Sequence, residues 1–112
     1  MKAMEIVLPN GKKITMREPK RQELGLFLRS GTALEAIGKI IEAVDQNKQG
    51  IIVPVPDMPP DEVLAPLDDL MMACTGMGKE EYDELSSLLY SWLALVKAFG
   101  ALQNFLSVEP TS

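Results

Sequence analysis

Apolar and polar residues alternate over the first part of the chain, on either side of a tight turn. Residues 4–8 and 14–17 are short runs rich in apolar residues, and Pro9-Asn10-Gly11-Lys12 separates them. Asn-Gly between two such runs is the strongest short-range signal for a β-hairpin, because both residues tolerate a positive φ. The pattern predicts a hairpin over about residues 4–17, whose alternation groups the apolar side chains of each strand on one face: Ile6 with Leu8, and Ile14 with Met16.

Two helices are predicted between about residues 19 and 46, because apolar residues recur there at i, i+3, i+4 spacing. Pro19 suits the first turn of the first helix. Ser30-Gly31 separates the two helices, and Thr32 with Glu35 fits a capping box at the start of the second. The buried stripes are expected to consist of Leu24, Phe27 and Leu28 in the first helix and of Leu34, Ile37, Ile40, Ile41 and Val44 in the second.

Proline dominates the next segment, so we predict a connector over residues 47–60. Residues 51–60, IIVPVPDMPP, contain four of the eight prolines in the chain. Pro54 and Pro56 have no N–H to donate to a sheet, so we expect a stiff extended linker rather than a central strand. Recognition of this polyproline-like stretch by a partner is the alternative interpretation.

Helical spacing returns over about residues 61–106. The first of these helices begins at Pro60 or Asp61, and Pro66 within it either kinks the first turns or marks the start of the helix proper. It ends at Thr75-Gly76, where glycine suits a left-handed C-cap. Acidic helical turns over residues 79–85 lead into one long helix that ends near Leu106. The apolar side of the first helix is expected to consist of Val63, Leu64, Leu67, Leu70 and Met71, and that of the long helix of Leu85, Leu88, Leu89, Trp92, Val96, Phe99, Leu102 and Leu106.

The long last helix has very few charged residues. Between Leu85 and Val108 only Lys97 is charged, and apolar residues continue around the arc where a monomeric protein carries lysine and glutamate. A chain of this size has too little other material to cover such a helix on all sides, so we expect part of it to contact another molecule. The predicted partner-binding residues are Tyr90, Trp92, Leu93, Val96, Phe99, Leu102, Phe105 and Leu106, and they imply a homo-oligomer or an obligate partner.

Length and composition limit both the fold and the chemistry. The 112 residues, 46% hydrophobic and 24% charged, suffice for one domain over residues 1–112, mainly α with a short N-terminal β-hairpin (α+β). The chain has no histidine and one cysteine, Cys74, which we expect to be a buried structural thiol. These absences argue against catalytic triads and zinc sites. We therefore predict a protein that is not an enzyme and has no catalytic residues, cofactor or metal.

Charge is distributed unevenly along the chain. Residues 1–30 hold seven basic and three acidic groups, whereas residues 57–84 hold nine acidic groups and one lysine. The net charge of -5 and the lack of aromatic residues among the basic ones argue against nucleic-acid binding. The opposed charges favour head-to-tail attraction between copies, and ordinary solvated faces are the alternative explanation.

Three short motifs follow one another along the chain. MREPKRQEL comes at the end of the predicted hairpin, MMACTGMGKEEYDEL closes a helix on Thr-Gly before an acidic stretch, and NFLS ends the last helix. In this order they resemble the small tail assembly chaperones of long-tailed phages. Relative to that family, residues 51–60 look like an insertion.

The resemblance implies a non-enzymatic chaperone that assembles with copies of itself, solubilises a long helical client, the tape measure protein, and helps to recruit tail tube subunits. It also implies a location in the cytoplasm of the host bacterium and absence from the finished virion. Two alternatives stay open. The low-charge span is long enough for a membrane-active, phage lysis-type protein, although Lys97 near its middle argues against membrane insertion. A monomeric inhibitor or adaptor of a host protein is the other alternative.

Overall fold

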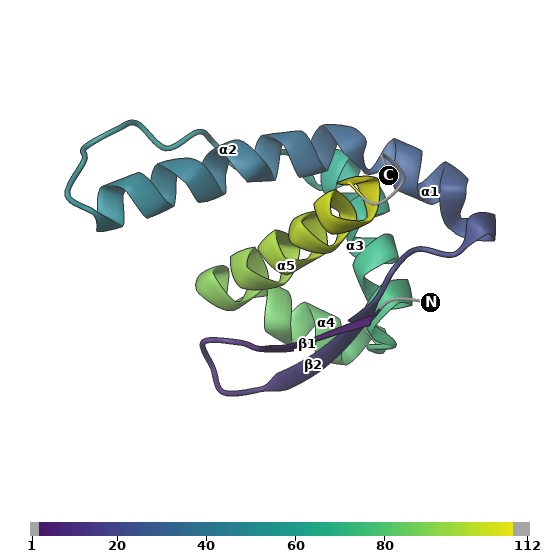
Figure 1. The fold of residues 1–112 in the computed structure, drawn as a ribbon. Helices are drawn as coiled ribbons and strands as arrows, with labels where there is room; N and C mark the ends of the chain where they lie inside the picture. The colour runs from purple at the N-terminus through teal and green to yellow at the C-terminus, as the bar shows by residue number, and fades with distance from the viewer. Residues whose placement is uncertain (1–2, 109–112) are drawn as a thin grey trace.

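The computed structural model of this protein describes the backbone of residues 3–108 and the side chains of residues 3–102. Within these residues the chain forms a β-hairpin, one short 3₁₀-helix and five α-helices, which confirms the predicted mainly α, α+β fold (Figure 1). The long helix α5 (Leu89–Val108) lies between α2 (Gly31–Lys48) and the hairpin (Figure 1). α4 (Lys79–Ser86) packs against α5, and α3 (Asp61–Thr75) packs against α2 and the second strand.

The N-terminal hairpin follows the alternation of the sequence. β1 (Ala3–Val7) pairs antiparallel with β2 (Lys13–Arg17), so that Met4 faces Met16 and Ile6 faces Ile14. Gly11 lies in the turn at a φ of 86°, a conformation that costs glycine little. One face of the hairpin rests on the helices and buries Leu8, Ile14 and Met16, so the predicted grouping of apolar side chains is confirmed.

The chain after the hairpin forms the 3₁₀-helix η1 (Arg21–Glu23) and the short helix α1 (Leu24–Arg29). The prediction that Leu24 and Leu28 belong to a buried stripe is wrong, because they are 56% and 67% exposed. α1 is less than two turns long and packs against α3, with only Leu26 and Phe27 partly buried against the core.

The predicted capping box at Thr32 and Glu35 is also wrong. α2 begins at Gly31, so Thr32 already lies in its first turn, and the N-cap is Ser30. The Ser30 hydroxyl donates to the carbonyl of Phe27 at 2.7 Å, within the preceding helix rather than within α2. α1 therefore continues almost directly into α2, which buries Ala33, Ile37, Ile40 and Ala43 and leaves Leu34, Ile41 and Val44 partly buried.

The extended connector without strand pairing is confirmed over residues 51–60, but its predicted start at residue 47 is wrong, because α2 continues to Lys48 and residues 49–50 form a turn. The Asn47 side-chain amide donates to the carbonyl of Val53 at 3.0 Å and so holds the start of the connector to the end of α2. α3 follows directly at Asp61 and ends as predicted at Gly76, whose φ of 74° places it in the left-handed C-cap conformation.

The chain bends sharply between α4 and α5, where the sequence predicts one continuous apolar stripe. The axes of the two helices differ by 110°. This bend separates Leu85, which is buried, from Leu88 and Leu89, which are about half exposed. The prediction of a stripe running unbroken from Leu85 into the last helix is therefore wrong.

The bend also changes how the last helix is covered. Because α4 folds back against α5 while α2 and the hairpin lie on either side, the described part of α5 has neighbours from its own chain on most of its circumference. Its buried side chains are Ser91, Trp92, Leu93, Leu95, Val96, Phe99 and Leu102. Contacts within the chain therefore bury the large apolar residues of this helix from Trp92 to Leu102, whereas Leu89, Tyr90 and Ala101 stay exposed.

Candidate interaction surface on the last helix

The eight residues predicted to bind a partner separate into three groups. Five are core residues of the single chain and are not available at its surface: Trp92, Leu93, Val96, Phe99 and Leu102. Tyr90 is about half exposed at the first turn of α5. The side chains of Phe105 and Leu106 lie outside the described residues. Of the predicted set, Tyr90 is thus the residue that the described structure leaves at the surface.

The solvent-facing side of α5 is built from small residues instead. Ala94 and Ala98 are partly exposed and Ala101 is exposed, and their i, i+4, i+7 spacing places them on one face of the helix. Lys97 is the charged residue on that face. The sequence indicates this alanine face through the small uncharged residues that lie between the large apolar ones. The prediction instead selected the larger apolar residues because of their size.

Hollows on both sides of this alanine strip form what we call the α5 furrow. Between α5 and α2 lie hollows of about 150 Å³ and 510 Å³, and between α5 and β1 lies one of about 360 Å³. Lys97 lines all three, so they join around the exposed side of the helix. Leu34, Ile41 and Val44 contribute the α2 wall, and Ile6 and Val7 contribute the β1 wall.

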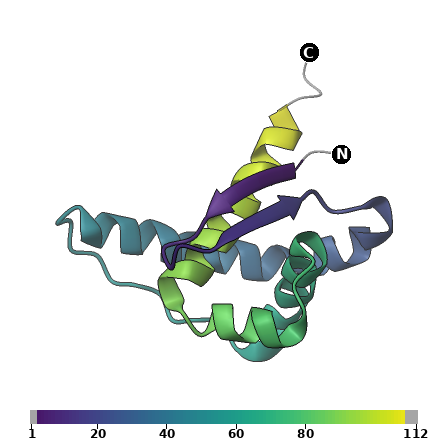
Figure 2. The ribbon, with the colours of Figure 1, turned by 90° about the horizontal axis from the view of Figure 1, so that it is seen from below.

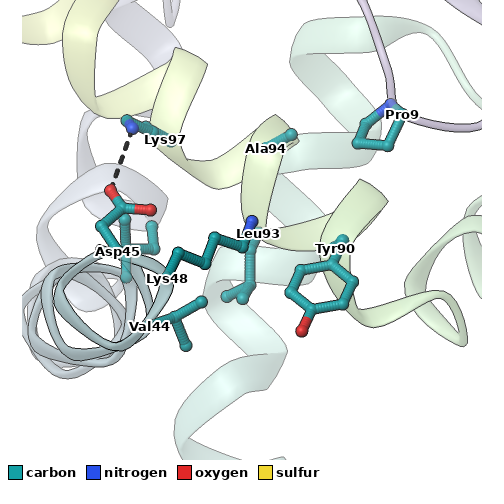
Figure 3. Close-up of a pocket in the computed structure, with 9 residues that line it drawn as sticks. Pro9, Val44, Asp45, Lys48, Tyr90, Leu93, Ala94 and Lys97 are labelled. Carbon is teal, nitrogen blue, oxygen red and sulfur yellow. Dashed lines mark hydrogen bonds and ion pairs between the residues drawn. The ribbon is translucent and has the colours of Figure 1, made fainter. Parts of the chain in front are cut away.

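Two lysines and one aromatic ring define the end of the furrow next to the hairpin turn (Figure 3). The Lys97 ammonium lies 3.2 Å from Asp45 Oδ2 of α2 and so bridges the two helices. The Lys48 ammonium lies 4.6 Å from the centre of the Tyr90 ring, within the range of a cation–π contact. Exposed pairs of this kind contribute little stability. The Asp45 carboxylate nevertheless balances the charge of Lys97 within the furrow.

A buried hydrogen-bond chain fixes the start of α5 beneath this surface. The indole N–H of Trp92 donates to the Tyr82 hydroxyl at 2.9 Å, and that hydroxyl donates to Asp68 Oδ1 at 2.6 Å. Burial raises the pKa of Asp68 and, together with the hydrogen bond to Asp68, raises the pKa of Tyr82. The chain links α3, α4 and α5 and thereby sets the direction of the bend after α4.

Replacing Tyr82 by phenylalanine removes the middle of this chain and leaves the Trp92 indole N–H without its partner. We expect the free energy of unfolding to fall by about 1–3 kcal/mol, the usual effect of leaving a buried polar group unsatisfied. Urea denaturation followed by the fluorescence of Trp92, the only tryptophan of the chain, measures this loss. Tyr90→Phe is the matched control and is expected to change the free energy of unfolding by less than about 0.5 kcal/mol. The Tyr90 hydroxyl is not part of the hydrogen bonds that join Trp92, Tyr82 and Asp68. Equal effects of the two substitutions would contradict the prediction.

Comparison with known proteins does not identify relatives of this chain. No family model, curated protein or solved structure matches this chain. Its family membership is therefore not established by similarity.

The described residues also bear on metal binding, on the state of the thiol and on membrane insertion. No group of three potential ligands in the described part of the chain is placed to hold a metal ion. Cys74 is buried, as predicted, and burial raises the pKa of its thiol to about 11. Among the described residues, no single helix is long and apolar enough to cross a membrane, whereas α4 and α5 pass that test together as a pair bent by 110°.

Proposed function

We propose that this chain is a small chaperone that binds a long helical client, in the manner of the tail assembly chaperones that bind the tape measure protein of long-tailed phages. The observation that carries the proposal is the α5 furrow, whose floor of Ala94, Ala98 and Ala101 lies between the apolar walls of α2 and β1. Small floor residues allow the backbone of a docked helix to approach closely, and the walls contact its apolar stripe. The resemblance of the sequence motifs supplies the identity of the proposed client.

The positions of two motifs support the resemblance in a second way. Arg17 of MREPKRQEL donates to the carbonyl of Ala73 in MMACTGMGKEEYDEL at 2.9 Å. Lys12, in the hairpin turn, forms an ion pair with Glu81 of the same second motif. The two motifs therefore lie together although Arg17 and Ala73 are 56 positions apart in the chain, as expected of segments that maintain one fold. This arrangement also assigns them to folding rather than to client contact.

The remaining parts of the proposal follow from the resemblance. They are assembly with copies of itself, help in recruiting tail tube subunits, action in the cytoplasm of the host bacterium and absence from the finished virion. None of them requires an enzymatic site, a cofactor, a nucleic acid or a membrane. A membrane-active protein would instead recover with the membrane fraction after cell lysis, so fractionation separates that alternative from the chaperone.

Co-expression with the tape measure protein of the same genome tests client binding. We expect the chain to keep that protein in the soluble fraction and to co-purify with it. Ala101→Arg places a long cationic side chain on the furrow floor at an exposed position and is expected to abolish both effects without unfolding the chain. Ala65→Arg is the matched control, because Ala65 is an exposed helical alanine on α3, away from the furrow. A client that stays soluble and bound with Ala101→Arg would contradict the proposed site, and a client insoluble with the wild-type chain would contradict the function.

A further inference from the structure

Two exposed apolar surfaces outside the furrow have opposite charge and lie at opposite ends of α2. The first, the α1 face, carries Leu24 and Leu28, and the second belongs to the connector that follows α2 (Figure 1). The 18 residues of α2 separate the two surfaces by about 27 Å. One molecule cannot bring them together, so any contact between them joins two molecules.

The α1 face is apolar with a basic border. Leu24 and Leu28 are one helical turn apart and both exposed. Arg21 precedes Leu24 by one turn. The Arg29 guanidinium lies over Gly25, since a Cβ atom added at Gly25 would be 3.4 Å from Arg29 Nη1. Glu23, the acidic residue between them, is already neutralised by a bidentate ion pair with Arg17. The charge that the α1 face presents to an approaching molecule is therefore positive.

The connector carries exposed apolar side chains at every third residue. Proline fixes its own φ and favours extended backbone in the residue before it, so most of residues 53–60 are held near a polyproline II conformation. Pro60 has φ -65° and ψ 159°, in agreement with that geometry. With three residues per turn, every third position lies on the same side of this segment. The outward row, which we call the connector ridge, consists of Ile52, Val55 and Met58, which are 92%, 48% and 43% exposed.

The connector ridge has an acidic border. Residues 49–78 contain five acidic groups and no basic one, and Asp57, Asp61 and Glu62 are exposed. Lys48, the basic residue just before this stretch, is engaged over the ring of Tyr90. Met58 and Asp61 also line a hollow of about 330 Å³ with Leu89 and Asp68, so the ridge adjoins the start of α5 across a partly polar, acidic surface. This end of the molecule is therefore apolar and negative, which complements the α1 face.

We propose that the α1 face of one copy binds the connector ridge of a second copy. The leucines of α1 pack between the aliphatic side chains of the ridge, and the arginines of α1 approach the carboxylates beside it. The ordered backbone of the ridge lowers the entropy lost on binding. The contact is heterologous, because each copy uses two different surfaces, so copies add head to tail into rings or filaments. The inference rests on the proposed function in that it names the surfaces through which copies of the chaperone assemble.

Sedimentation velocity of the full chain at increasing concentration tests this contact. The wild-type chain is expected to grow beyond a dimer, and to dissociate at salt concentrations that screen exposed charges, about 0.5 M or more. Leu28→Asp disables the α1 face and Ile52→Asp disables the ridge, and both residues are exposed, so each variant is expected to fold and to stay monomeric. An equimolar mixture of the two variants retains one intact contact and is expected to form a dimer and nothing larger.

Each other outcome overturns the proposal. A wild-type chain that stays monomeric, a single variant that assembles like the wild type, a mixture that stays monomeric, and a mixture that grows beyond a dimer all contradict it. Val7→Asp is the matched control for assembly alone, because Val7 is exposed and belongs to the furrow wall rather than to either surface, and it is expected to assemble like the wild type. Ala101→Arg is expected to assemble as well, so loss of assembly and loss of client binding are measured by different variants.

Discussion

Replacing Phe99 by alanine is expected to lower the free energy of unfolding by about 3–5 kcal/mol. Phe99 is fully buried in the middle of α5, a helix that packs against α2, α4 and β1. Truncation to alanine removes most of a large buried side chain and leaves a cavity that the backbone of three elements prevents from closing. Because domains of this size have about 5–15 kcal/mol of stability, the variant is expected to be close to its unfolding threshold.

Calorimetry and urea denaturation of the wild type and of Phe99→Ala measure this loss. Phe27→Ala is the matched control, since Phe27 is a phenylalanine that α1 buries only in part. We expect it to lose clearly less stability than Phe99→Ala. A loss of less than about 1 kcal/mol for Phe99→Ala would contradict the placement of α5 in the core of one chain, and would return Phe99 to the list of partner-binding residues.

The elements that the sequence predicts correctly are those that local chemistry determines. Asn10-Gly11 can form a tight turn whatever surrounds it, and the hairpin follows from that turn. Gly76 ends α3 because few other residues adopt its left-handed conformation at low cost. The extended connector follows from the prolines themselves (Figure 2 shows it running from α2 to α3). In each case a residue and its neighbours along the chain contain the necessary information.

The bend after α4 and the exposure of α1 could not be predicted in the same way. No glycine or proline lies between Leu85 and Leu89, and the bend instead depends on contacts that α4 and α5 make with α3 through Tyr82, Trp92 and Asp68. The spacing of Leu24 and Leu28 is that of a buried stripe, but burial requires a neighbouring element that faces them. Helical spacing therefore predicts which residues share a face, and tertiary packing decides whether that face is covered.

The same distinction explains the error at the candidate interaction surface. Large apolar residues on α5 satisfy the fold first, because a small domain needs them for its core. What remains at the surface is the strip of alanines that the large residues leave behind, together with Tyr90. The prediction located a partner surface on α5 by its lack of charge. It could not divide the residues of that helix between core and surface without knowing where the chain bends.

Replacing Arg17 by methionine is expected to lower the free energy of unfolding by about 2–3 kcal/mol at neutral pH. The Arg17 guanidinium joins three parts of the fold at the end of β2. It forms two hydrogen bonds with the Glu23 carboxylate, at 2.8 and 2.9 Å, and donates to the carbonyls of Ala73 and Glu18. Methionine retains much of the apolar stem of arginine but leaves these acceptors without their donor. The hairpin is then held to α3 by apolar packing alone.

The pH dependence of the same variant distinguishes the ion pair from general packing. The hydrogen bonds from Arg17, together with one from the backbone N–H of Lys20, lower the pKa of Glu23 from 4.5 to about 2. A carboxylate with a lowered pKa stabilises the fold above pH 4.5, and this contribution is lost as the pH falls from 4.5 toward 2. The stability of the wild type is therefore expected to fall in this range through Glu23, whereas Arg17→Met lacks the part of this loss that is due to Arg17 and keeps the smaller part that is due to Lys20. The difference between the two proteins is expected to narrow as the solution becomes more acidic.

The raised pKa of Asp68 changes stability with pH in the opposite direction. Burial raises its pKa, so its charged form costs stability at neutral pH, and protonation relieves that cost as the pH falls. Asp68 is present in both proteins and cancels in the difference between them, so urea denaturation of the pair at a series of pH values isolates the Arg17–Glu23 contact. Lys79→Met, which removes the exposed ion pair with Asp83, is expected to change stability by less than about 0.5 kcal/mol. If the difference between the wild type and Arg17→Met were the same at every pH, the contribution of Arg17 would be packing of its stem, and the ion pair would not be what fastens the hairpin to α3.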